Sequence, residues 1–247
     1  MTSFYFFDTL SSTMDEARSR VLQGIEEGSV IVAIQQSNGR GRRGRAWESP
    51  PGNLYLTYIT YAKTSFSKAP QLSFVACVAA GQELRSILPP THSLTYKWPN
   101  DLLLNGKKVG GFLLEAVEIP TRNEIGYLIG CGLNLKTYPD QVRYPATTFQ
   151  SEGIYLSLEE VLLGLSSSLQ RYISLWQKEE FPAIQALWME HAANLGKEIS
   201  VDFEGQLTEG IFEGIDEEGL LVLKTSKGRI KLMAGEILSK VSRAACY

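Results

Sequence analysis

The chain has 247 residues, of which 44% are hydrophobic and 21% charged, and its formal net charge is −3. This is the composition of an ordinary soluble globular protein with one large or two unequal domains, and it argues against a disordered or polybasic chain. The N-terminus has no basic residue ahead of its short apolar stretch, and the longest apolar stretch, around residues 72–81, is much shorter than the roughly 20 residues that span a bilayer. We expect a cytoplasmic protein without a membrane segment.

Cysteine and histidine are too few and too scattered for a metal centre. Cys77, Cys131 and Cys246 are odd in number and contain no CxxC pair, which predicts neither a disulfide framework nor a zinc site. His92 and His191 are far apart and lack HExxH spacing. We therefore expect buried or terminal free thiols and no histidine-based metal site or catalytic triad.

The first part of the chain alternates strand-like and helix-like segments. The predicted elements are strands at 3–7, 29–35 and 54–62 and helices at 11–23 and 69–88. Four further strand-like runs follow: LTYKWP, LLL, KKVGGFLLEAV and IGYLIGCGLNL, with a tight hairpin turn at Asn105 and Gly106. This order predicts an α/β or α+β domain, built on a mixed sheet flanked by helices.

The second part of the chain is first helical and then strand-rich. The sequence S-L-E-E at Ser157 is typical of a helix start, and helical spacing continues through a second helix to about Ala193. Short strands separated by glycine-containing turns follow, with the sequences EISVDF, LTEGIFEGI, GLLVLKT and RIKLMAG. We predict a small all-β barrel and a boundary near Asn194, which divides the chain into domains 1–193 and 194–247.

The segment NGRGRRGRAW, residues 38–47, contains four arginines and three glycines. Its glycines match G-x-G-x-x-G, but that dinucleotide fingerprint needs a helix at the third glycine and an acid about 20 residues later. Here two prolines follow, and no Asp or Glu lies between Glu48 and Glu83. The glycine spacing also fits a P-loop, but Arg45 and Ala46 stand where that loop needs Lys and Ser or Thr. Neither nucleotide-binding motif is satisfied.

Physical chemistry suggests a different use for this segment. Arg40, Arg42, Arg43 and Arg45 repel one another and the glycines add unfolded-state entropy, so we expect order only around an anion such as a phosphate or a carboxylate. Guanidinium groups bind both bidentately. Trp47 either belongs to the core or stacks on a base. The alternative for the whole segment is a solvated basic loop with glycines for its turns.

A second motif, KWPND, begins at Lys97. Pro99 ends the strand that carries this lysine, and Asn100 and Asp101 lie in the turn that follows. Taken alone, Lys97 is typical of a surface lysine. Together with the arginines it is a second fixed cation, as a reaction between two anions requires.

In combination these motifs resemble those of a biotin protein ligase. GRGRRGR followed by Trp, KWPND followed by a Gly-Gly strand, GCGLN and a small C-terminal barrel occur in this order over nearly the whole chain. The resemblance implies a mixed sheet flanked by helices, followed by an SH3-like barrel. It also implies two reaction steps. Biotin attacks ATP to give biotinyl-adenylate, with Mg²⁺ accompanying the phosphates, and the adenylate then acylates a lysine of a biotin carboxyl carrier domain.

The resemblance assigns roles to particular residues. It places Lys97 beside the biotin carboxylate and the α-phosphate and Arg42 on the adenylate, so these two are the catalytic candidates, while Arg40 with Gly41 clamps biotin and phosphate. The other binding candidates are Ser12, Thr13, Gln36, Gly39, Arg45, Trp47, Gly110, Gly130, Gly132 and Asn134.

Three points stay open within these assignments. Asn100 and Asp101 are the two candidate ligands for Mg²⁺. Ser12 and Thr13 are equally typical of helix caps, and the glycines of GCGLN are also typical of a bulge in a buried strand. The family often has Asn after its Ser-Thr pair where this chain has Met14, which puts one polar contact with biotin in doubt.

Two other functions remain alternatives. A lipoate or octanoate ligase shares the fold and the adenylate chemistry, and a phosphate-binding or nucleic-acid-binding module would use the arginines without catalysis. Some biotin ligases also bind an operator through an N-terminal helix-turn-helix, but only about eight residues precede the first predicted helix here. We expect no operator binding. The sequence does not indicate whether the chain forms a homodimer.

Overall fold

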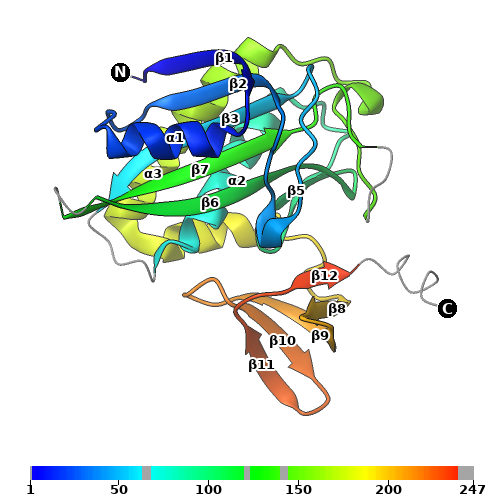
Figure 1. The fold of residues 1–247 in the computed structure, drawn as a ribbon. Helices are drawn as coiled ribbons and strands as arrows, with labels where there is room; N and C mark the ends of the chain where they lie inside the picture. The colour runs from blue at the N-terminus through cyan, green and yellow to red at the C-terminus, as the bar shows by residue number, and fades with distance from the viewer. Residues whose placement is uncertain (1, 63–67, 120–122, 140–143, 239–247) are drawn as a thin grey trace.

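The computed structural model describes residues 2–62, 68–119, 123–139 and 144–238 and contains two β-sheets (Figure 1). The larger sheet has seven strands in the order β1-β2-β3-β7-β6-β5-β4. Its strands are β1 (Phe4–Leu10), β2 (Val30–Gln36), β3 (Leu54–Ala62), β4 (Leu94–Lys97), β5 (Asp101–Leu104), β6 (Lys107–Ile119) and β7 (Glu124–Leu133). Only the β1–β2 pair is parallel, and the other five pairs are antiparallel. The predicted mixed sheet is confirmed.

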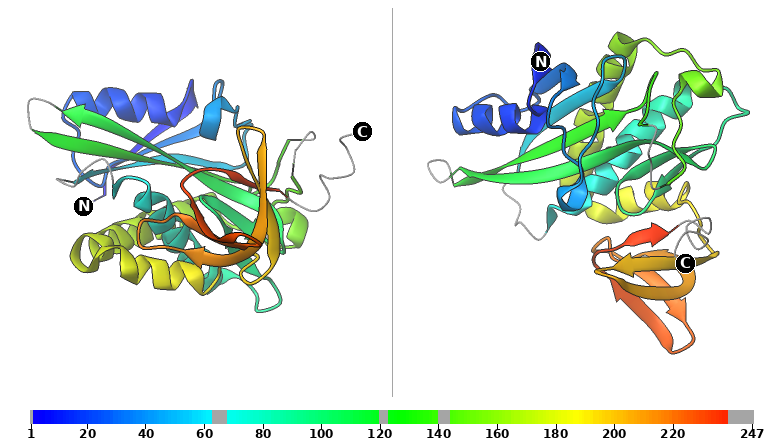
Figure 2. Two further views of the ribbon diagram at one scale, coloured as in Figure 1. Left: turned by 90° about the horizontal axis from the view of Figure 1, so that it is seen from below. Right: turned by 45° about the vertical axis from the view of Figure 1, so that its right-hand side comes forward.

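Helices cover both faces of this sheet (Figure 2). They are α1 (Thr13–Leu22), α2 (Gln71–Ile87) and α3 (Leu158–Met189). On one face α1 buries Met14, Ala17 and Val21 against the sheet, whereas α2 and α3 pack over the opposite face in a separate, larger core. Because α1 is short, the strand ends beyond its N-terminus stay uncovered by helix, and the cavity described below lies there.

The local signals in the sequence correspond to real caps and turns. The Ser12 hydroxyl caps α1 by accepting a hydrogen bond from the backbone N–H of Met14. Asn105 and Gly106 have φ of 51° and 78°, as a tight hairpin turn between β5 and β6 requires. The C-terminal helical segment, labelled α3, consists of two helices, as predicted, which meet at a kink where Glu180 has a φ of 60° and a ψ of −170°, shortly before Pro182.

The second sheet is smaller and wholly antiparallel, with the order β11-β10-β9-β8-β12. Its strands are β8 (Glu198–Phe203), β9 (Gln206–Ile215), β10 (Leu221–Thr225), β11 (Gly228–Leu232) and β12 (Glu236–Leu238). The sequence predicted the first four strands and missed the three-residue β12. The predicted small all-β domain is confirmed, with β11 and β12 at the two ends of the described strand order.

The small sheet packs against the first. Trp98 donates its indole N–H to the carbonyl oxygen of Gly219 at 3.1 Å, and the Gln185 amide donates to that of Ile215 at 2.6 Å. Phe212 and Ile237 are buried in the same continuous core as α2 and α3. These contacts fix β12 beside the strand ends of the large sheet.

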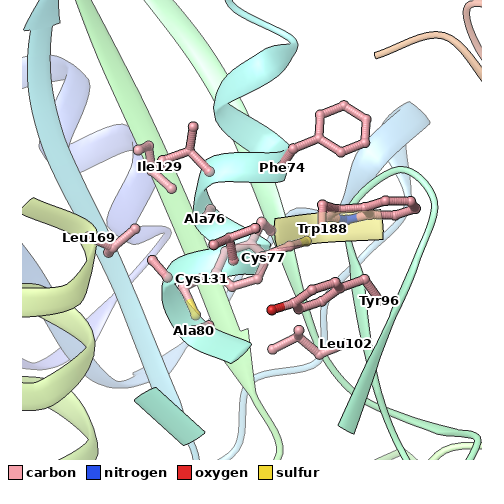
Figure 3. Close-up of a cluster of buried hydrophobic side chains, with 14 of the residues drawn as sticks. Phe74, Ala76, Cys77, Ala80, Tyr96, Leu102, Ile129, Cys131, Leu169 and Trp188 are labelled. Atoms are coloured by element: carbon pink, nitrogen blue, oxygen red, sulfur yellow. The ribbon is translucent and has the colours of Figure 1, made fainter. Parts of the chain in front are cut away.

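An aromatic cluster supports the end of β4 (Figure 3). The ring of Trp188 stacks on that of Tyr96 and meets Phe74 edge to face, with centroid separations of 6.0 and 5.4 Å. Cys77 and Cys131 lie in the same core as buried free thiols, and burial raises the pKa of both, so they act as small apolar groups. Because Tyr96 directly precedes Lys97, this packing positions the lysine.

Two further expectations concern Cys246 and membrane segments. Cys246 lies outside the described residues. None of the helices within the described ranges is long and apolar enough to cross a membrane.

Candidate functional site

A cavity of about 370 Å³ opens where the two sheets meet. Its walls come from the N-terminus of α1, the segment after β2, the turn between β4 and β5, the middle of β6, the C-terminal end of β7, and the residues at the start of β12. Six of the side chains that line it are cationic and three are acidic, although the whole chain has a net charge of −3. The cavity is therefore a local positive region suited to an anionic ligand.

Residues 39–47, here called the arginine loop, fold back on themselves. The loop closes on itself through a bridge between Arg40 and Ala46 and a 2.7 Å hydrogen bond from the Gly41 N–H to the Arg45 carbonyl oxygen. Between them, residues 42–44 form one 3₁₀ turn. The expectation that this segment orders only around a bound anion stays a prediction.

Carboxylates of the protein itself supply the ordering charge. Arg40 donates to Asp15 of α1 at 2.5 Å and to Glu115 of β6 at 3.0 Å. Arg45 binds Glu236 of β12 with both terminal nitrogens. These charge-assisted contacts hold the loop at both ends and offset the repulsion between its arginines. Sequence reasoning missed all three carboxylates because they lie far from the loop along the chain or in a strand that was not predicted.

The two predicted catalytic residues are held differently. Within the part of the chain that the structure describes, neither Arg42 nor Lys97 has a carboxylate within salt-bridge distance. Arg42 donates to the amide oxygen of Asn100 at 3.1 Å, and the Lys97 ammonium lies 4.1 Å from the centre of the Tyr144 ring. Burial lowers the pKa of both groups, and the negative charge of Asp101 opposes that shift. A bound anion would stabilise the charged forms of both groups and so oppose the lowering of their pKa by desolvation.

Lys108 also lines the cavity, and the sequence analysis did not predict it as a site residue. Its ammonium lies 2.7 Å from a carboxylate oxygen of Asp101 and 5.3 Å from the centre of the Trp47 ring. Its neighbour Lys107 instead pairs with Glu152, away from the cavity. The alternation of side chains along a strand could have indicated Lys108, because two adjacent lysines on β6 must face opposite sides of the sheet.

A neutral wall faces these cations. Thr13 donates its backbone N–H and its hydroxyl to the Gln36 amide oxygen at 2.8 and 3.1 Å, and the Gln36 amide nitrogen donates to the Ser49 hydroxyl at 2.8 Å. The Thr57 hydroxyl donates to that of Thr13 at 2.9 Å. Ser12 also lines the cavity while it caps α1, so both readings of Ser12 are compatible. The structure thus brings together the predicted residues Ser12, Thr13 and Gln36.

The glycines of β7 make room for two side chains of the protein itself. A Cβ atom on Gly130 would lie 2.7 Å from the Met14 sulfur, and one on Gly132 would lie 2.6 Å from the Trp47 ring. Met14 and Trp47 therefore rest directly on the strand and form the floor of the cavity. Asn134 also lines the cavity, and its amide donates to the Thr147 carbonyl oxygen at 3.2 Å.

Two predicted glycines lie behind the cavity wall. A Cβ atom on Gly39 would come within 2.3 Å of the Trp47 carbonyl oxygen, and one on Gly110 within 2.4 Å of the Leu133 side chain. Neither is among the residues that line the cavity. Their role in this structure is to allow close packing of the backbone behind Trp47 and between β6 and β7.

The two candidate magnesium ligands are both engaged with cations. The Asn100 amide oxygen accepts from Arg42, and Asp101 pairs with Lys108. Among the described residues, no three His, Cys, Asp or Glu side chains are grouped so that they could hold a metal ion. In this structure the oxygens of Asn100 and Asp101 thus face cations of the protein, and their assignment to Mg²⁺ stays a prediction.

Comparison with known proteins agrees with the fold and the cavity. Residues 6–134 match the biotin/lipoate A/B protein ligase family, and residues 195–238 match the C-terminal domain of biotin protein ligases. The biotin–[acetyl-CoA-carboxylase] ligase of Paracoccus denitrificans is 35% identical over 88% of this chain and 93% of its own, and the bifunctional ligase/repressor BirA of Bacillus subtilis is 31% identical over 94% and 72%.

Solved structures give the same result at the level of the fold. The biotin protein ligase of Aquifex aeolicus in complex with biotin and ATP superposes with a TM-score of 0.80 at 24% identity, covering 96% of this chain and 97% of that one. The chain thus has the fold of this solved structure, a mixed-sheet domain followed by a small β-domain. The family model and the sequence relatives show that the chain belongs to the biotin protein ligase family.

The pairing of Arg45 with Glu236 predicts a measurable change in loop mobility. Glu236→Gln removes the anchor in the small sheet but leaves every arginine of the loop in place. We expect trypsin to cleave the loop about three to five times faster, as loss of a partly exposed ion pair worth under 1 kcal/mol predicts. Glu213→Gln, which breaks the exposed Arg229 pair at a distant point of the same sheet, is the matched control. Equal cleavage of the two variants would show that Glu236 does not restrain the loop.

Proposed function

We propose that the protein ligates biotin to a lysine of a biotin carboxyl carrier domain, with ATP as the energy source and biotinyl-5′-adenylate as the intermediate. One observation carries this proposal: two desolvated cations, Arg42 and Lys97, line the same cavity as a neutral wall of hydrogen-bonding side chains, and neither has a carboxylate partner among the described residues. Such a cavity suits a ligand with a neutral polar head and an anionic tail. The names of the relatives support the same substrate class.

The first step joins two anions. A carboxylate oxygen of biotin attacks the α-phosphorus of ATP, the bond to the β-phosphate oxygen breaks, and pyrophosphate leaves. Negative charge gathers around the α-phosphate in the transition state, so cations that are already in place lower the barrier. We assign this role to Lys97 and Arg42, and we add Lys108 because its ammonium lines the same cavity.

In this proposal biotin and the nucleotide occupy different ends of the cavity. Thr13 and Gln36 offer neutral hydrogen-bonding groups for the biotin ring, and Ser12 and Met14 lie beside them. The nucleotide end is formed by the arginine loop and by Trp47, whose indole N–H has no hydrogen-bond partner among the described residues. We place the adenylate there, over the Trp47 ring that rests on Gly132 and beside Asn134. Arg42 is directed to its phosphate, and Arg40, Gly41 and Arg45 belong to the loop that surrounds it.

The second step transfers the acyl group. The amine of an acceptor lysine attacks the acyl carbon of the adenylate, the bond to the phosphate oxygen breaks, AMP leaves and an amide forms. Until then the adenylate must be kept from water. We propose that residues 1–193 form the catalytic domain and that the domain of residues 194–247 contributes to this shielding, since Glu236 of β12 lines the cavity.

The direct test is ATP–pyrophosphate exchange by the purified protein with Mg²⁺, comparing biotin, lipoate and octanoate. We expect exchange that depends on biotin, because the wall of Thr13 and Gln36 is polar and a saturated acyl chain could not use it. Exchange with lipoate or octanoate instead would make the protein a lipoate-type ligase of the same fold. The absence of exchange with all three would contradict adenylate formation.

Lys97→Ala tests the proposed catalytic role of the lysine. Loss of one preorganised cation should lower the rate of biotin-dependent exchange by about a hundredfold, with an unchanged melting temperature. Lys107→Ala is the matched control, because Lys107 is paired with Glu152 outside the cavity. This variant should catalyse ATP–pyrophosphate exchange at the wild-type rate. A near-normal rate for the Lys97 variant would remove this residue from the mechanism.

A further inference from the structure

A chain of charged side chains joins α1, the arginine loop and β6. Arg40 of the loop is shared by Asp15 of α1, at 2.5 Å, and Glu115 of β6, at 3.0 Å. The other carboxylate oxygen of Glu115 accepts from Arg18 of α1 at 2.8 Å. Each of the two carboxylate oxygens of Glu115 thus has one arginine partner, so its orientation is fixed from both sides.

Only one member of this network of charged side chains lines the cavity. Arg40 lines the cavity, whereas Asp15, Arg18 and Glu115 do not. Asp15 lies two residues after Thr13, on the first turn of α1, where its charge is also favoured by the helix N-terminus. The network therefore ties the neutral wall at the start of α1 to the loop that faces it.

The network is too exposed to matter mainly for global stability. The side chains of Arg40 and Glu115 are 31% and 22% exposed, and that of Asp15 is 47% exposed. Ion pairs of this kind contribute little to the free energy of unfolding, typically under 1 kcal/mol. Locally they act on a glycine-rich segment that has little apolar surface to hold it, so the same contacts can decide where the loop lies.

We infer that Glu115, oriented by Arg18, is a positioning residue that acts through Arg40 to hold the arginine loop closed over the reaction intermediate. This inference rests on the proposed function and deepens it. Glu115 lies outside the cavity, and the sequence gives no signal for it. Its effect should appear in retention of the adenylate more than in its formation, because the reacting atoms meet Arg42 and Lys97.

The experiment compares Glu115→Gln, which removes the charge and keeps the shape, with Glu118→Gln at an exposed position of the same strand. For each, the adenylate released into solution is measured per adenylate formed, together with the KM for ATP and the melting temperature. We expect about a threefold to fivefold rise in release for Glu115→Gln, which corresponds to a loss of somewhat under 1 kcal/mol of loop closure, with little change in the melting temperature. Arg18→Gln should change release in the same direction but less.

A double-mutant cycle separates positioning from a general structural effect. If Glu115 acts through Arg40, then Glu115→Gln should have no further effect on release in an Arg40→Gln background. The inference would be overturned if Glu115→Gln raised adenylate release by the same factor in the Arg40→Gln background as in the wild type. Equal release by Glu115→Gln and Glu118→Gln would also overturn it.

Failure of the proposed function would look different. The wild-type protein would then show no biotin-dependent exchange. The anchoring is still tested without ligand by tryptic cleavage of the loop, which should be faster in Glu115→Gln than in Glu118→Gln. Equal cleavage would overturn the positioning role as well.

Discussion

The site depends on how four arginines of one short loop are divided between the protein and its ligand. Arg40 and Arg45 are each paired with carboxylates from other elements, and Arg43 lies over the Phe203 ring with its guanidinium 5.5 Å from the ring centre. Among the described residues, the guanidinium of Arg42 donates to the neutral amide oxygen of Asn100 and has no carboxylate within salt-bridge distance. The carboxylates that pair with Arg40 and Arg45 offset part of the repulsion between the arginines, so the charge of Arg42 remains available to a ligand.

This division connects the fold to the chemistry. The two anchors belong to different sheets, so the packing of the small sheet on the large one, through contacts such as Trp98 with Gly219, also determines where the loop lies. Opposite the loop, Thr13 and Gln36 satisfy each other by hydrogen bonds and need no charged partner. A neutral polar head and an anionic tail therefore find separate places in one cavity, which is the arrangement an acyl-adenylate requires.

Local signals in the sequence predicted local structure well. The Ser12 cap, the turn at Asn105 and Gly106 and the alternation of the strands needed only neighbouring residues to be recognised, and the mixed sheet followed from their order. The carboxylate partners of the loop could not be predicted, because Glu115 and Glu236 lie 75 and 191 residues from the arginines they bind. The expectation that the loop orders only around an anion considered the repulsion between its arginines without these distant carboxylates. The assignment of Gly130 and Gly132 to ligand contact did not anticipate that Met14 and Trp47 rest on them.

The most direct test of the central claim is to compare Arg42→Gly with Arg43→Gly for labelling of bystander proteins, such as serum albumin, in the presence of biotin and ATP. If Arg42 alone is left for the ligand, its loss should let the reactive adenylate escape, so that bystander lysines are biotinylated at least tenfold more than by the wild type. Arg43→Gly, which removes an arginine of the same loop that lies over Phe203, should leave labelling near the wild-type level. Equal labelling by the two variants, or labelling only by Arg43→Gly, would contradict the account.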